Sequence, residues 1–229
     1  MFISFINVFI KHTEEGEVLL TTAGYVGLIV LMLLLLVAIA AFGKSSKKLK
    51  TKQLVFASTA IALAIVTSFI KFGSLPFGGS ITLFSMFFIS FVGYLYGLKV
   101  GLLTAIAYGI LQLIIEPYIY HPLQILLDYP FAFGCLGLSG IFGNNRMKSS
   151  QYNLLYGYLI GVFGRYICHV ISGYIFFRNY APESWNPMLY TLGYNSTYIV
   201  PEVIATVVIL LLPSIRNALM EVKKMAIHD

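Results

Sequence analysis

Long apolar stretches with almost no charge constrain this chain more than any other feature. A helix that crosses a bilayer needs about 20 predominantly apolar residues. We find seven segments of about this length, at residues 18–43, 54–72, 80–97, 100–116, 122–142, 153–177 and 198–215. Only 10% of the 229 residues are charged, whereas soluble domains carry roughly 25%. So few charges cannot coat a soluble surface, and the sequence therefore predicts an all-α integral membrane protein.

The first predicted span stands apart from the other six. It is a plain Leu/Val/Ala helix followed by the basic run Lys44–Lys52, whereas the later spans follow one another through short connections. It is too long for a signal-peptide core and no small-residue cleavage site follows it, so we expect it to be retained. We therefore divide the chain into residues 1–52, an extra N-terminal transmembrane helix with a basic cytoplasmic linker, and residues 53–229, a six-helix substrate-binding membrane domain.

The lysines and arginines predict the orientation in the membrane. Positively charged loops remain in the cytoplasm, which places the run Lys44–Lys52 inside. Alternation from there places the other basic connections inside too, at Lys99, Arg146, Lys148, Arg216, Lys223 and Lys224. The N-terminus is then outside and the C-terminus inside. The outward loops are residues 73–79, 117–121 and 178–197.

The composition argues against several classes of function. The net charge of +6 resides in short loops between apolar segments, which is a topological signal rather than a sign of nucleic-acid binding. We find no phosphate-binding glycine loop of an ATPase and no cluster with metal-ligand spacing, so we expect neither a cofactor nor a metal. Cys135 and Cys168 lie in apolar segments with no second thiol nearby in the sequence, and we interpret them as small core residues.

Small residues four apart indicate close helix packing. Gly157 and Gly161 form one such pair, and Ala60 and Ala64 form another. Most pairs of this kind pack helices within a bundle, and the alternative is a docking face for another membrane subunit. Ala60 and Ala64 lie on an otherwise featureless helix, so they are our candidate for that face.

A few ionisable residues lie within the predicted spans, where they usually mark function. At 1.5 Å per residue, Asp128 lies roughly 9 Å and His169 roughly 12 Å below the outer face. Arg165 precedes His169 by four residues and shares its helix face. Each group could also be structural, as a core histidine or as an Arg–Asp pair that joins two helices. The matched depth favours a shared outward-facing pocket.

Aromatic residues are concentrated at the same level. They are Phe77, Tyr118, Tyr120, Tyr129, Phe176, Phe177, Tyr180, Trp185, Tyr190, Tyr194 and Tyr198. Most could belong to an interfacial aromatic belt. A carboxylate among aromatic faces, however, suits an organic cation with a flat ring, through charge complementarity and cation–π attraction.

Four stretches of the sequence resemble a known family. Residues 78–83 read GGSITL, residues 121–133 HPLQILLDYPFAF, residues 165–182 RYICHVISGYIFFRNYAP and residues 190–201 YTLGYNSTYIVP. In this order they resemble the thiamine-specific substrate-binding subunit of energy-coupling factor (ECF) transporters. The resemblance implies a six-helix bundle in a prokaryotic plasma membrane that binds thiamine near its outer face. It also implies partners, a transmembrane coupling subunit and two cytoplasmic ATPases, and no covalent chemistry by this chain.

The resemblance also implies roles for individual residues. The positions implied to contact thiamine are Tyr118, Asp128, Tyr129, His169, Gly173, Phe177, Tyr190 and Asn195. Asp128 is the carboxylate, where some members carry Glu, and Phe177 stacks on the ligand, where Trp is frequent. Ala60 and Ala64 match the small-residue motif that docks on the coupling subunit. The alternatives are a binding protein for another small aromatic vitamin or a thiamine precursor, and an intramembrane enzyme that uses Asp128, Arg165 and His169.

Overall fold

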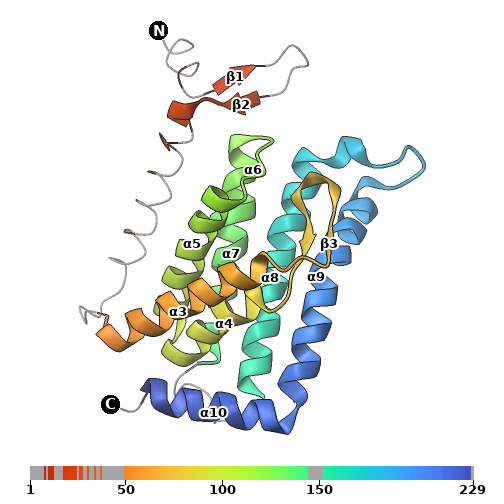
Figure 1. Ribbon diagram of the computed structural model, residues 1–229. Helices are drawn as coiled ribbons and strands as arrows, with labels where there is room; N and C mark the ends of the chain where they lie inside the picture. Colours follow the sequence, from red (N-terminus) through yellow and green to blue (C-terminus); the bar gives the residue numbers. More distant parts are fainter. Residues whose placement is uncertain are drawn as a thin grey trace.

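The molecule is a bundle of helices standing side by side, with one helix lying across its lower end (Figure 1). The computed structural model describes residues 49–143 and 152–227, together with scattered residues between 8 and 37. The bundle contains α3 (Thr51–Ser68), α4 (Ser85–Tyr96), α5 (Leu98–Ile115), α8 (Asn153–Phe176), α9 (Pro187–Leu211) and a segmented helix between α5 and α8. Helix α10 (Pro213–Ile227) is the one that lies across the end.

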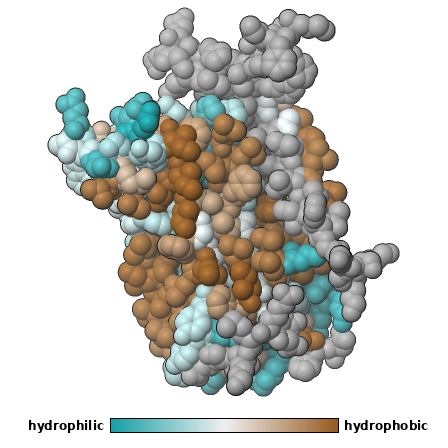
Figure 2. All heavy atoms as spheres, turned by 180° about the vertical axis from the view of Figure 1, so that it is seen from behind, coloured by the Kyte–Doolittle hydropathy of each residue, from teal (hydrophilic) through white to brown (hydrophobic). Residues whose placement is uncertain are grey.

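Six of these elements cross the bundle, as an all-α membrane fold requires. Within the described residues, α3, α5, the segmented helix, α8 and α9 are long and apolar enough to span a bilayer. Helix α4 is apolar but has only 12 residues. Large apolar side chains are exposed on the outside of the bundle, among them Val66, Phe163 and Ile204, and Figure 2 shows a broad hydrophobic surface on one face. The prediction of a multi-pass helical membrane protein is confirmed.

The segmented helix replaces the single span predicted at 122–142. It comprises α6 (Pro122–Leu126), the π-helical turn η2 (Leu127–Phe131), α7 (Ala132–Gly134) and the 3-10 segment η3 (Cys135–Ile141). Pro130 lies inside the π-helical turn, where the missing N–H of proline removes one regular helical hydrogen bond. Such π-helical turns are frequent at functional sites, and this one contains Asp128.

Two predicted helix boundaries are wrong. The segment predicted to begin at residue 80 becomes helical only at Ser85, because Ser80–Ile81 forms strand β4 and Phe84 has a left-handed φ of 60°. Strand β4 pairs with β3 (Gly73–Ser74) in an antiparallel hairpin. The last span begins at Pro187 rather than at residue 198, because the Asn186 side chain accepts a hydrogen bond from the Met188 N–H and caps the helix. Much of the predicted outer loop 178–197 is therefore helix.

The N-terminal region is described only in part. Ile10–His12 (β1) pairs with Val18–Leu20 (β2), so the predicted first span cannot begin at residue 18. The described residues between 22 and 37 are helical, and the rest of that predicted span lies outside the described residues. The same is true of the basic residues at 44–48, Arg146 and Lys148.

Ala60 and Ala64 point into the bundle, which contradicts their predicted role as a docking face. They are 8% and 0% exposed, and the Tyr108 hydroxyl donates a long hydrogen bond, 3.5 Å, to the Ala64 carbonyl oxygen. Helix α3 is apolar on all sides, so residue spacing alone could not show which side faces inward. Its outer side instead presents another small pair with the same spacing, Ser58 and Ala62, both exposed.

Candidate ligand-binding site

Two adjoining cavities lie at the end of the bundle opposite α10. The larger, about 130 Å³, is lined by Tyr118, Asp128, Tyr129 and His169 among others. The smaller, about 40 Å³, is lined by the other four predicted site residues, Gly173, Phe177, Tyr190 and Asn195. Asp128, His169, Phe77 and Tyr198 line both cavities. The structure therefore gathers all eight residues that the resemblance implied.

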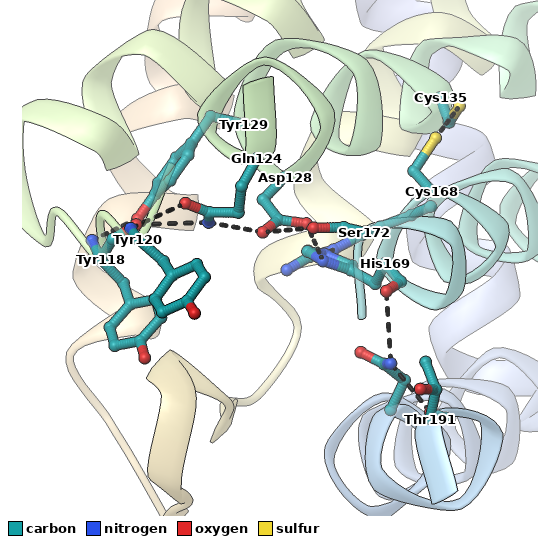
Figure 3. Close-up of polar contacts among 12 residues, drawn as sticks. Tyr118, Tyr120, Gln124, Asp128, Tyr129, Cys135, Cys168, His169, Ser172 and Thr191 are labelled. Atoms are coloured by element: carbon teal, nitrogen blue, oxygen red, sulfur yellow. Dashed lines mark hydrogen bonds and ion pairs between the residues drawn. The ribbon is translucent and has the colours of Figure 1, made fainter. Parts of the chain in front are cut away.

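Asp128 is the centre of the polar contacts in Figure 3. Its Oδ1 lies 3.1 Å from the Nδ1 of His169. Its Oδ2 accepts hydrogen bonds from Gln124 Nε2 at 2.6 Å and from the Ser172 hydroxyl at 3.0 Å. A carboxylate can accept about four hydrogen bonds, so these three contacts leave room for one more donor. The carboxylate is thus held in place by neighbours on two helices and can still receive a ligand.

Arg165 fixes the state of His169. The Arg165 Nε donates to the His169 Nε2 at 3.3 Å, so that ring nitrogen is an acceptor and the proton of the neutral imidazole resides on Nδ1. The Nδ1–H group then donates to Asp128. The guanidinium group lies 4.1 Å above the centre of the Phe133 ring. In the described residues Arg165 thus contacts Asp128 through His169 and does not form the direct Arg–Asp pair considered from the sequence.

Gln124 connects Asp128 to the loop that precedes α6. Its Nε2 also donates to the Tyr118 carbonyl oxygen at 3.3 Å, and its Oε1 accepts from the Tyr120 N–H at 3.1 Å. The Tyr129 hydroxyl accepts from the Tyr118 N–H at 2.8 Å and donates to the Glu116 carbonyl oxygen at 2.9 Å. The aromatic loop residues are therefore fixed relative to the carboxylate.

Aromatic rings form the outer wall of the site. The Phe177 ring centre lies 4.9 Å from that of Tyr120, 6.1 Å from Tyr118 and 5.7 Å from Phe77. Phe77 belongs to the tight turn η1 (Pro76–Gly78) between β3 and β4, and it has a left-handed φ of 62°. Phe77 also packs 4.5 Å from Tyr180, in the short turn η4 (Arg178–Tyr180). Rings from three separate loops thus meet within a few ångströms of one another.

Helix α9 closes the site from the side. A Cβ atom at Gly173 would lie 2.5 Å from Thr191 Cγ2, so only glycine lets α8 and α9 approach this closely. Asn195 Nδ2 donates to the Thr191 carbonyl oxygen at 2.9 Å, and the Tyr198 hydroxyl donates to Asn195 Oδ1 at 2.6 Å. Tyr190 and Asn195 both lie in α9, a little more than one helical turn apart. The sequence had placed Tyr190 in the outer loop, and that placement is wrong.

Glu202 forms the deep end of the larger cavity. It is 3% exposed and accepts hydrogen bonds from the Thr82 hydroxyl at 2.7 Å, the Ser85 hydroxyl at 3.2 Å and the Met86 N–H at 3.0 Å. These contacts join α9 to the start of α4. The sequence predicted no role for Glu202, Gln124, Ser172 or Thr191. Gln124 and Thr191 precede Asp128 and Asn195 by four residues, and Ser172 follows His169 by three, so this spacing on a shared helix face could have indicated these three.

Comparison with known proteins shows what kind of protein has this site. The model of the thiamine transporter protein family (Thia_YuaJ) matches residues 54–221, which include every site residue described above. The chain belongs to the thiamine transporter family. The resemblance found in the four sequence stretches is confirmed. Because this is a family of transporters, the intramembrane-enzyme alternative no longer holds.

Individual members of the family give the extent of the similarity. The chain is 35% identical over 167 residues to the thiamine transporter ThiT of Bacillus subtilis, covering 69% of this chain and 85% of that one. It is 32% identical over 126 residues to ThiT of Lacticaseibacillus paracasei, covering 49% and 62%. A solved structure of ThiT from Listeria monocytogenes matches with a TM-score of 0.59 at 22% identity, over 72% of this chain and 96% of that chain. This structure supports the fold.

Proposed function

We propose that this protein binds thiamine near the outer face of the membrane and delivers it for uptake. Thiamine joins an aminopyrimidine ring to a thiazolium ring with a permanent positive charge. The observation that supports the proposal most is Asp128, a carboxylate held by three hydrogen bonds next to a wall of aromatic rings. The carboxylate complements the charge, and the ring faces attract the cation and stack on its rings.

Asp128 is surrounded by hydrogen-bond donors, and within the described residues no lysine or arginine pairs with it directly. Gln124, Ser172 and the Nδ1–H group of His169 all donate to it. An ionised group that remains unpaired in a partly apolar site is costly. A cationic ligand would remove that cost, so this arrangement suits thiamine better than a neutral vitamin.

Binding thiamine would require some rearrangement around the two cavities. The two cavities are smaller than the roughly 300–1,000 Å³ of typical ligand pockets. Phe77 and Tyr198 line both of them, so these two rings lie where the cavities would merge. Phe77 is the easier ring to displace, because it belongs to a tight turn rather than to a long helix.

The direct test is titration of the purified full-length protein with thiamine, followed by tyrosine and tryptophan fluorescence. We expect saturable binding with a stoichiometry of one, and weaker binding of the separate pyrimidine and thiazole precursors. Tighter binding of a precursor would support the alternative ligand class that the sequence left open. Absence of any thiamine-dependent change in fluorescence and in calorimetry would contradict the proposal.

For uptake we propose the partners of an ECF transporter, a transmembrane coupling subunit and two cytoplasmic ATPases. The outer side of α3 supports this proposal, because few of its residues pack within the described chain. Its apolar side chains Val55, Leu63 and Val66 are exposed, beside the small exposed pair Ser58 and Ala62. Small residues let another membrane helix approach closely, so this side replaces the buried Ala60 and Ala64 as the proposed docking face.

We also propose that the site end faces outside and the α10 end faces the cytoplasm of a prokaryotic cell. Lys50 and Lys52 line a cavity together with Tyr96 and Ala226, which places the start of α3, the end of α4 and the end of α10 together. Lys99, at the start of α5, directly follows α4. At the site end, Lys71 pairs with Glu116 at 2.7 Å. This distribution follows the positive-inside rule.

A further inference from the structure

Cys135 on the segmented helix and Cys168 on α8 face each other, although they are 33 residues apart in the chain (Figure 3). Their Sγ atoms are 3.8 Å apart. Cys135 is the first residue of η3, and Cys168 lies in α8, directly before His169. The sequence, in which neither cysteine has a second thiol nearby, did not predict this pair, because a contact between distant segments is not visible in the sequence.

A stripe of glycines brings these two helices together. A Cβ atom at Gly161 would lie 3.0 Å from Leu136 Cα, and one at Gly164 would lie 2.9 Å from Cys135 Cβ. Cys168 follows Gly164 by four residues and continues the same helix face. Disulfides need Cβ atoms roughly 3.5–4.5 Å apart and sulfurs about 2.05 Å apart. With helices this close, rotation of the two side chains and a small shift of α8 would close the remaining gap.

The thiol pair lies apart from the binding site and toward the lipid. Neither cysteine belongs to the described residues that line the two cavities, and both are partly exposed. Their surroundings include exposed apolar residues, Ile167 and Ile171 on α8 and Phe131 on the segmented helix. Cys135 lies within the apolar span Pro122–Ile141 and Cys168 within the apolar span Asn153–Phe176, each several residues from either end. We therefore expect a reactant dissolved in the lipid to reach the thiols more readily than a water-soluble reactant.

We propose that Cys135 and Cys168 are a redox-active dithiol that a lipid-soluble quinone oxidises to a disulfide. Two S–H bonds break and one S–S bond forms. The two electrons and two protons reduce the quinone to its hydroquinone. A small dithiol reductant reverses the step by thiol–disulfide exchange.

The disulfide would lock together the two helices that carry the site. Cys168 directly precedes His169 in α8. Cys135 lies two residues after Phe133, and the Arg165 guanidinium group lies over the Phe133 ring. Both helices also meet at Asp128, through His169 and Ser172. A covalent link at this interface opposes separation of α8 from the segmented helix, so we expect slower exchange of the ligand. This consequence rests on the proposed function, whereas formation of the disulfide does not.

The first test counts free thiols in the purified full-length protein. The protein is reduced, incorporated into lipid nanodiscs and treated with a tetrasubstituted benzoquinone, which has no open ring carbon to form a thioether. It is then unfolded in detergent and alkylated, and mass spectrometry of the intact protein gives the number of alkyl groups added. We expect two alkyl groups on the untreated protein and none on the oxidised protein. The matched controls Cys135→Ser and Cys168→Ser should carry one alkyl group in both states.

Two outcomes would overturn the proposal at this stage. One is an oxidised wild-type protein that still takes up two alkyl groups. The other is loss of the thiols through a disulfide-linked dimer, seen by non-reducing electrophoresis. An increase in the melting temperature on oxidation, present in the wild type and absent from Cys135→Ser, would support an intramolecular link.

The second test measures the dissociation rate of thiamine before and after oxidation. We expect at least a roughly threefold decrease in the wild type and no change in Cys135→Ser. A disulfide that forms without changing the rate would overturn the locking effect. Failure of the reduced wild type to bind thiamine would instead contradict the proposed function, and the thiol count would still decide the redox proposal.

Discussion

The Nδ1 of His169 lies 3.1 Å from Oδ1 of Asp128, a residue 41 positions earlier in the chain. This contact connects α8 to the segmented helix. Arg165 on the other side of the ring fixes the imidazole as a donor to the carboxylate. Three residues therefore act as one polar unit, in which Arg165 affects Asp128 through His169.

The first prediction concerns Arg165. Arg165→Lys keeps the positive charge and removes the Nε–H that donates to His169. A typical hydrogen bond contributes about 0.5–1.5 kcal/mol, so we expect thiamine affinity to fall by roughly three- to tenfold with little change in thermal stability. Titration calorimetry measures the affinity, and Arg178→Lys outside the cavities is the control. Unchanged affinity in Arg165→Lys would mean that His169 does not depend on Arg165.

The sequence predicted the membrane fold because the apolar runs of the six later spans are long and nearly free of charge. It could not predict details that depend on one residue's backbone or on a distant contact. The late start of α4 depends on the left-handed Phe84. The early start of α9 depends on the cap by Asn186, in a segment whose tyrosines and polar residues are typical of a loop.

The predicted site residues, which line the two adjoining cavities, came mainly from the resemblance to a family. Composition and depth indicated only that Asp128 and His169 could meet, which they do. The inward direction of Ala60 and Ala64 was not predictable, because an apolar helix in lipid lacks the polar side that marks the outer surface of a soluble helix.

The second prediction tests orientation in the membrane. In a background with both cysteines replaced by serine, Lys48→Cys should remain unlabelled by a membrane-impermeant maleimide in intact cells, and Glu183→Cys should be labelled. The physical reason is the excess of lysine and arginine at the α10 end. Lysed cells, in which both positions should react, provide the control. Labelling of position 48 in intact cells would reverse the proposed orientation.

The third prediction tests the docking side of α3. Ala62→Trp places a bulky ring on the exposed outer side, so we expect it to abolish thiamine uptake in cells that contain the coupling subunit and ATPases. Binding by the purified variant should stay within about twofold of the wild type. Ile171→Trp, an exposed position on α8, is the control and should preserve uptake. If both variants transport normally, the coupling subunit does not dock on this side of α3.

The fourth prediction concerns the aromatic wall. Phe177 is 9% exposed and contacts rings from two loops. Phe177→Ala should weaken binding at least threefold, because stacking contributes about 0.5–1.5 kcal/mol beyond area burial. The loss should be similar for thiamine and for a neutral thiophene analogue, since stacking does not require the charge. Phe177→Trp should restore binding, and a loss confined to the charged ligand would contradict a stacking role.

The central claim is that Asp128 recognises the positive charge of thiamine. Asp128→Asn keeps the shape of the side chain and removes its charge. We expect thiamine to bind at least about tenfold more weakly, or 1.4 kcal/mol, because the thiazolium loses its only proposed counter-charge. The neutral thiophene analogue, which has the same shape without the charge, should lose much less.

Calorimetric titration of wild type and Asp128→Asn with these two ligands is the most direct measurement. The account predicts a large loss for thiamine and a small loss for the analogue. Equal losses for both ligands would show that Asp128 joins the helices through His169 and Ser172 without recognising charge, and would contradict the account.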